Sequence, residues 1–332
     1  MEIQFFNFWY FLFIILSFGT YIGLYFLLRN KSEKTKKIVL FSILVFGLVL
    51  HFTKNFYPPY STDKSRYYRD IFFVNICGAS IALFPFIFIS KSDKAKDYMF
   101  YLGVISGILS ILVPLEPIQK VSQSTEWIDI IRFYIHHTEI WVVPLLMVTL
   151  KLHKLNYKRI LCVPTQFMIV LLFIILNQFF QSELGFIPLR NNNFFDINWK
   201  NTSFIYGPGK ESFVIVFTIL CPKIFRTVPV GVYAGQEKYW PWFWLIVPVY
   251  VYLTILSFLI SLIFDGKHFV SDMKILKQKI KDTYDNIFKK NVKEIAQNTE
   301  IKKQNNEIII DESMQNDNIL ENAEILENKN IE

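Results

Sequence analysis

Charged residues are scarce in this sequence. Of its 332 residues only 19% are Asp, Glu, Lys or Arg, whereas 52% are hydrophobic and 17% are aromatic. Soluble proteins carry about a quarter charged residues, and one water-surrounded core cannot bury so large an apolar excess. The composition therefore excludes a soluble enzyme or a disordered protein for most of the chain and indicates a protein embedded in lipid.

Cysteine is scarce as well. The three cysteines, Cys77, Cys162 and Cys221, lie far apart in or beside apolar runs and form no CxxC pair. This pattern predicts neither a disulfide framework nor a zinc site. We therefore expect no metal ion, and the sequence calls for no cofactor.

Long apolar runs, in contrast, are frequent. A helix needs about 20 mostly apolar residues to cross roughly 30 Å of hydrocarbon. The sequence thus predicts an all-α bundle of about seven transmembrane helices within residues 1–264. The predicted spans are residues 5–28, 37–53, 70–90, 97–116, 128–150, 159–180 and 240–264.

The chain carries a formal net charge of +7. Its basic residues lie in clusters between the apolar runs, which is typical of cytoplasmic loops and excludes nucleic acid as a partner. The clusters are Arg29, Lys31, Lys34, Lys36 and Lys37; Lys91, Lys94 and Lys96; Lys151, Lys154, Lys158 and Arg159; and Lys267, Lys274, Lys277, Lys279 and Lys281. Positive-inside counting predicts a multi-pass protein of the cell membrane with its N-terminus outside and its C-terminus in the cytoplasm. The loop with Lys54, Lys64, Arg66 and Arg69 departs from this rule.

Residues 181–239 separate the sixth and seventh predicted spans. Within them the apolar run 213–220 is too short to cross a membrane and ends at Cys221-Pro222. We predict an interfacial or re-entrant helix there, at the outer mouth of the bundle. The aromatic run 239–244 predicts an interfacial belt at the start of the last span.

The composition changes after residue 264. Residues 265–296 space apolar side chains among lysines, which predicts a basic amphipathic helix on the anionic inner leaflet. Residues 297–332 are rich in Asn and Glu and predict an acidic tail that is disordered or loosely helical.

Ionisable residues inside the spans are costly and therefore mark functional sites. In the fifth span Asp129, Arg132, His136 and Glu139 follow at spacings of three, four and three, which places them on one helical stripe. His137 points about 100° away from His136. A simpler interpretation pairs Arg132 with Glu139 to neutralise their burial.

Depth within the membrane connects this span with the others. At about 1.5 Å per residue, Cys77 lies roughly 10 Å and His137 roughly 13 Å below the outer boundary. His51, Glu116 and Asn177 fall near the outer ends of their spans. The polar residues therefore gather in the outer half of the bundle, which predicts a wet cavity that opens outward.

A cysteine and a histidine at one depth suggest nucleophilic catalysis, because a thiol needs an adjacent imidazole to become a reactive thiolate. Other interpretations remain open. Cys77 can be a small apolar core residue, and His136 and His137 can form hydrogen bonds between helices.

The order of landmarks resembles the YwaF family of bacterial integral membrane proteins, which shares its fold with eukaryotic transmembrane protein 164. The landmarks are the runs 73–77 (Phe-Val-Asn-Ile-Cys), 102–114 with Gly103, Gly107 and Pro114, 133–137 (Phe-Tyr-Ile-His-His) and 240–242 (Trp-Pro-Trp). The resemblance implies an acyltransferase that moves fatty acyl chains between phospholipids, with Cys77 as nucleophile and His137 as its histidine.

Three interpretations of the function follow. In the first, Cys77 attacks an ester of a membrane phospholipid, His137 is the general base, and Asn75 or His136 donates to the oxyanion. The alternative is a transporter or receptor whose polar residues bind a small solute or relay protons. The binding residues of this transporter or receptor are Arg132, Glu139, Glu116, Asn177 and His51. A membrane scaffold that recruits partners through the C-terminal segment is a third interpretation.

Overall fold

The structure is a computed structural model. It describes residues 2–58, 60–63, 71–119, 127–185, 203–208, 214–226, 235 and 237–328. The chain divides into two compact units, Met1–Gly266 and Lys267–Glu332. Lys64, Arg66, Arg69 and part of residues 181–239 lie outside the described residues, as do residues 329–332.

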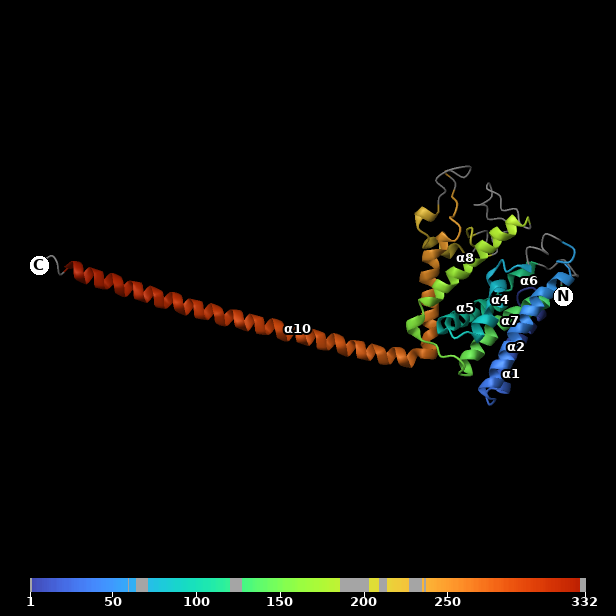
Figure 1. Ribbon diagram of the computed structural model, residues 1–332, viewed down its shortest axis with the longest axis horizontal. Coiled ribbons are helices and arrows are strands. Elements are labelled where there is room, and N and C mark those ends of the chain that lie inside the picture. The colour runs from blue at the N-terminus through green and yellow to red at the C-terminus, as the bar shows by residue number, and fades with distance from the viewer. Residues whose placement is uncertain are drawn as a thin grey trace. The chain divides into compact units, whose positions relative to one another are not determined.

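All regular elements among the described residues are helices, which confirms the all-α fold (Figure 1). The α-helices are α1 (Phe8–Leu28), α2 (Glu33–Thr53), α4 (Ile76–Ile89), α5 (Asp93–Leu112), α6 (Leu115–Gln119), α7 (Trp127–Thr149), α8 (Cys162–Glu183), α9 (Ile215–Ile219) and α10 (Ile246–Asn328). Single 3₁₀ turns are η1 (Lys54–Phe56), η3 (Tyr157–Arg159), η6 (Lys223–Phe225) and η8 (Phe243–Leu245).

Polar caps decide where several helices begin. The Ser32 hydroxyl accepts a hydrogen bond from the Thr35 amide at 3.2 Å, and the Ser92 hydroxyl accepts one from the Ala95 amide at 3.2 Å. A serine in this position satisfies an amide that the helix leaves unpaired. Helices α2 and α5 therefore begin about four residues before the apolar runs that predicted them.

Within the described residues, five helices are long and apolar enough to cross a membrane, which supports a multi-pass membrane protein. They are Phe8–Leu28, Glu33–Phe56, Asp93–Ile118, Tyr157–Glu183 and Phe243–Thr299. The other two predicted spans also form helices. Helix α4 has only 14 residues, and α7 has 23 residues but carries the polar stripe.

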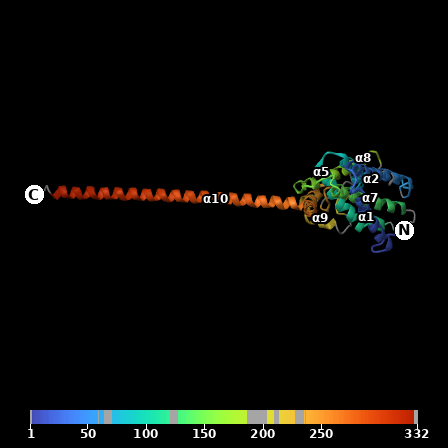
Figure 2. The same ribbon diagram turned by 90° about the horizontal axis from the view of Figure 1, so that it is seen from below.

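Helix α7 is the centre of the first unit. It packs against α1, α2, α4 and α5, and α5 also packs against α8. Figure 1 shows α7 beside α4 and α5, and Figure 2 shows it beside α1 and α2. The side chains on the central helix are therefore the ones most fully enclosed by the bundle.

Two glycines let α5 approach α7 closely. A Cβ atom at Gly103 would overlap the carbonyl oxygen of Ile140, and one at Gly107 would lie 2.8 Å from the Cβ of Trp141. Small residues at such positions are the usual means of close packing between membrane helices. The sequence spacing Gly-x-x-x-Gly thus positions the helix that carries His137.

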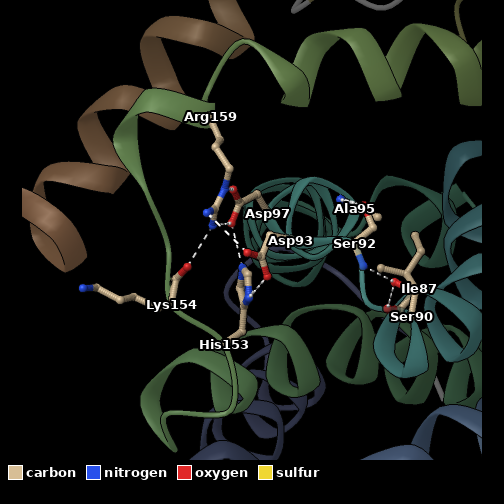
Figure 3. A network of polar contacts seen from close by, with 9 residues as sticks. All are labelled: Ile87, Ser90, Ser92, Asp93, Ala95, Asp97, His153, Lys154 and Arg159. Carbon is tan, nitrogen blue, oxygen red and sulfur yellow. Dashed lines mark hydrogen bonds and ion pairs between the residues drawn. The ribbon is translucent and has the colours of Figure 1, made fainter.

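A buried ion cluster ties the start of α5 to the segment between α7 and α8 (Figure 3). Asp97 is fully buried, and its carboxylate accepts hydrogen bonds from His153 Nε2 at 2.7 Å and from Arg159 Nε at 2.5 Å. Arg159 also donates to the Lys154 carbonyl oxygen at 2.9 Å. The cluster therefore joins the segment between α7 and α8 to α5 through polar contacts.

Replacing Asp97 by asparagine is expected to lower the free energy of unfolding by about 2 kcal/mol, because the partly buried cation of Arg159 loses its counter-ion. The measurement is thermal unfolding of the purified protein in detergent. Asp93→Asn is the matched control, since the Asp93 side chain is 63% exposed and its two contacts are 3.6 Å long. We expect that variant to change stability by less than about 0.5 kcal/mol. Equal melting temperatures for both variants would contradict the prediction.

The last span begins differently from the sequence prediction. Trp244 is fully buried, and its indole N–H lies 3.0 Å from the Phe204 carbonyl oxygen and 3.1 Å from that of Ile205. An interfacial belt residue would instead be exposed, so the prediction is wrong for Trp244. Packing against residues 203–206 takes precedence because the indole N–H finds its acceptors there.

Helix α10 contains a break at Asp265, whose backbone is not helical. The Asp265 carboxylate accepts a hydrogen bond from the Tyr157 amide at 3.1 Å. In the second unit the backbone is helical through Asn328, also over residues 297–328, for which the sequence predicted a disordered or loosely helical tail. The short helix α9 covers only Ile215–Ile219 of the apolar run 213–220, and Phe213 lies outside the described residues.

Candidate functional site

Cys77 lies in the first turn of α4. Asn75 is the N-cap, and its side-chain oxygen accepts a hydrogen bond from the Gly78 amide at 2.7 Å. The Ile76 amide donates to the Ser203 hydroxyl at 3.2 Å. Cys77 therefore lies at the positive end of the helix dipole. The side-chain oxygen of Asn75 accepts the capping hydrogen bond, and its side-chain NH₂ group is available to donate to a ligand.

His137 contacts the sulfur of Cys77. The distance between His137 Nε2 and Cys77 Sγ is 3.2 Å, and the distance between His137 Nδ1 and the Phe133 carbonyl oxygen is 2.7 Å. A carbonyl oxygen only accepts, so Nδ1 carries the proton of the neutral ring and Nε2 presents its lone pair to the thiol. The backbone of α7 thereby holds the imidazole in the tautomer that can take a proton from Cys77.

The pair borders a cavity of about 310 Å³. Seven of the nine predicted site residues line it, namely His51, Asn75, Cys77, Glu116, Arg132, His136 and His137; Lys54 and Tyr60 line it as well. These side chains come from α2, η1, α4, α6 and α7 and from the segments beside them. The polar residues that the sequence distributes over half the chain therefore meet in one place.

Arg132 is paired with Asp129 and not with Glu139. Its Nε lies 2.8 Å and its Nη2 lies 2.5 Å from Asp129 Oδ1. The interpretation that paired Arg132 with Glu139 is wrong, because the i to i+3 neighbour toward the start of the helix is within reach of both guanidinium nitrogens. Tyr60 supports the pair by accepting from Arg132 at 3.3 Å and donating to Asp129 at 3.4 Å.

His136 extends this network. Its Nδ1 accepts from Arg132 Nη1 at 3.2 Å, so its Nε2 carries the proton. That nitrogen is buried and has no hydrogen-bond partner in the part of the chain that the structure describes. The N–H of His136 Nε2 therefore lacks an acceptor among these residues, and such a group stabilises a developing oxyanion.

Tyr57 lies beside this network, outside the spans. Burial raises the pKa of Tyr57 to about 12, so its phenol stays neutral.

Two predicted residues do not join the cavity. Glu139 lies against Gly47 of α2 and borders a different, apolar cavity. Asn177 is on α8, and its amide nitrogen is buried without a partner among the described residues. The stripe along α7 is thus divided between two cavities. Asp129 and Glu139 are ten positions apart, which is nearly three helical turns, so they face different neighbouring side chains.

Sequence reasoning missed Lys54 and Tyr60. Lys54 is only 4% exposed, and its Nζ lies 3.3 Å from His51 Nε2. The prediction that Lys54 belongs to a loop is wrong, since 3₁₀ turn η1 continues α2 and keeps the side chain inside. One signal was present in the sequence, because a lysine at the outer end of a span departs from the positive-inside rule.

No three His, Cys, Asp or Glu side chains in the described ranges are placed to hold a metal ion. A family model described as the TMEM164 family matches residues 4–260. The chain belongs to the TMEM164 family. Among curated proteins and solved structures, none matches it.

The match with the TMEM164 family covers every residue of the cavity and ends within α10, before the break at Asp265. The relation to transmembrane protein 164 indicated by the sequence is confirmed, whereas the assignment to the bacterial YwaF family stays a prediction. The second unit, Lys267–Glu332, lies outside the part that defines the TMEM164 family.

Proposed function

We propose that this membrane protein transfers fatty acyl chains between phospholipids, with Cys77 as the nucleophile and His137 as the general base. The observation that supports this proposal is the 3.2 Å contact between Cys77 Sγ and His137 Nε2, in the tautomer that the Phe133 carbonyl oxygen imposes. The resemblance stated from the sequence assigns the same two positions.

In the first half-reaction His137 Nε2 takes the proton of the Cys77 thiol, and the thiolate attacks the carbonyl carbon of a lipid ester. The oxyanion that forms accepts hydrogen bonds from His136 Nε2–H and from the Asn75 amide. The carbon–oxygen bond of the ester then breaks, and His137 returns its proton to the leaving alcohol. A thioester on Cys77 remains.

In the second half-reaction the hydroxyl group of an acceptor lysolipid gives its proton to His137 and attacks the thioester. The carbon–sulfur bond breaks, and the thiolate recovers the proton from His137. No redox partner is needed, and one acyl chain has moved between two lipids. Because the bundle is surrounded by lipid, both substrates can approach sideways from the bilayer.

The charge pattern supports an orientation for this reaction. The N-terminus lies outside the cell membrane and the C-terminus in the cytoplasm, where the exposed lysines of residues 267–293 contact the anionic inner leaflet. The cavity then opens on the outer half of the membrane. The alternative of one solute site along α7 gains no support, because Glu139 borders a different cavity from Arg132.

A thiol-reactive lipid analogue tests the nucleophile. We expect purified protein to be labelled at Cys77 and Cys77→Ala to lose at least about nine-tenths of the labelling, since the thiolate is the reactive form. Cys162→Ala and Cys221→Ala are matched controls, because they remove the other two free cysteines. Labelling that persists in Cys77→Ala and disappears in either control would refute the assignment.

A further inference from the structure

A second cavity of about 430 Å³ lies between α1, α2 and α7. Apolar side chains form most of its wall, including Phe13 and Leu16 of α1 and Phe46 of α2. Leu16 is 54% and Phe46 is 58% exposed at the surface of the bundle. Since that surface faces lipid, the cavity is open to molecules that dissolve in the bilayer, and its size is that of an ordinary ligand site.

Glu139 is the carboxyl-bearing residue among those that line this cavity. It is only 5% exposed, and its carboxyl group lies against Gly47, where a Cβ atom would overlap it. No hydrogen bond or ion pair joins Glu139 to another described residue, and its Oε2 atom is fully buried without a partner. A buried carboxyl group without a partner is costly, so it calls for a ligand that pairs with it.

The hydroxyl groups of Ser17, Thr20 and Thr138 in this wall are already used within the fold. Ser17 accepts hydrogen bonds from Thr138 at 2.8 Å and from the Trp141 indole at 3.0 Å, and Thr20 donates to the Leu16 carbonyl oxygen at 2.7 Å. The Tyr134 hydroxyl belongs to the same lining and is buried without a partner among the described residues. The wall therefore offers an incoming molecule a long apolar surface, one carboxyl group and one phenol hydroxyl.

We propose that this cavity binds a long-chain lipid with a single hydroxyl group, whose chain lies against Phe13, Leu16 and Phe46 and whose hydroxyl pairs with Glu139. A hydroxyl group both donates and accepts, so it satisfies a carboxyl group in either protonation state. A phosphate or carboxylate ligand is disfavoured because the cavity wall carries no cation. The site is separate from Cys77, and the proposal does not depend on acyl transfer.

Photolabelling of the full chain in lipid nanodiscs tests the proposal. The probe is a clickable diazirine derivative of a C16 alcohol, and its methyl ether and the corresponding amine are the comparison probes. We expect saturable labelling of α1 and α7 by the alcohol, about fivefold above that by the methyl ether, because one hydrogen bond to the carboxyl group is lost. Labelling by the amine is expected to stay below that by the alcohol, because moving an ammonium group from water into this apolar cavity costs more than moving a hydroxyl group.

Three variants complete the experiment. Glu139→Leu is expected to lower saturable labelling by about fivefold, whereas Glu139→Gln keeps it within about twofold because the amide still forms a hydrogen bond. Leu16→Trp fills the mouth of the cavity and blocks labelling even if Glu139→Leu fails to fold. Cys77→Ala leaves labelling unchanged, which separates this proposal from the proposed function. Equal labelling by alcohol and ether, or stronger labelling by the amine, would overturn the proposal.

Discussion

Replacing His137 by alanine is expected to lower the rate of acyl transfer by about 10³-fold, which is the typical contribution of a general base. The thiol of Cys77 then has no acceptor for its proton, because His137 Nε2 is the group within 3.2 Å of the sulfur. The measurement follows a labelled acyl chain from a phospholipid to a lysophospholipid in proteoliposomes by mass spectrometry.

His268→Ala is the matched control for this experiment. His268 lies in the second unit, and its side chain is 38% exposed, so its loss leaves the cavity intact. Full activity in the control together with a large loss in His137→Ala supports the proposed base. If His137→Ala keeps more than about a tenth of the activity, His137 is not the general base of the reaction.

The second large effect is expected at Gly103. Replacing it by alanine adds a Cβ atom that meets the Ile140 carbonyl oxygen and lies 3.1 Å from both Phe84 Cε2 and Pro144 Cγ. Backbone atoms cannot move aside, so α5 and α7 must separate. We expect the free energy of unfolding to fall by about 3 kcal/mol, the upper range for overpacking, and thermal unfolding in detergent measures it.

Gly19→Ala makes the same chemical change where space is open. Gly19 is in the middle of α1, and apart from the backbone of its own helix and its chain neighbours no atom of the described residues lies within 4 Å of a Cβ atom there. Because alanine favours helices, we expect this variant to be as stable as the parent or more stable by up to about 1 kcal/mol. Equal losses of stability at Gly19 and Gly103 would mean that the approach of α5 to α7 is not the cause.

The helices could be predicted from the sequence because lipid makes length and hydropathy decisive. The predicted span 128–150 corresponds to α7 (Trp127–Thr149), and the span 5–28 corresponds to α1 (Phe8–Leu28). Depth arithmetic also placed Cys77 and His137 at one level, and they lie 3.2 Å apart in the structure. A spanning helix is nearly straight, so counting residues along it gives the depth of each residue in the membrane.

Rotation of each helix and its partners were not predictable in this way. The stripe of α7 holds both Asp129 and Glu139, and the structure shows that Arg132 pairs with Asp129, its neighbour three residues away. The sequence could not show that Lys54 is buried, because residue counting cannot distinguish a 3₁₀ turn that continues α2 from the start of a loop.

The shortness of α4 has a consequence for the reaction proposed here. Its 14 residues span about 21 Å, against roughly 30 Å of hydrocarbon, and Lys91 and Lys94 keep its C-terminal end near water. Cys77 then lies about 12 Å inside the opposite boundary of the hydrocarbon. A lipid ester at rest near the surface must descend by that distance to meet the thiol. Membrane thickness therefore becomes a variable of the rate, and local thinning around α4 shortens the descent.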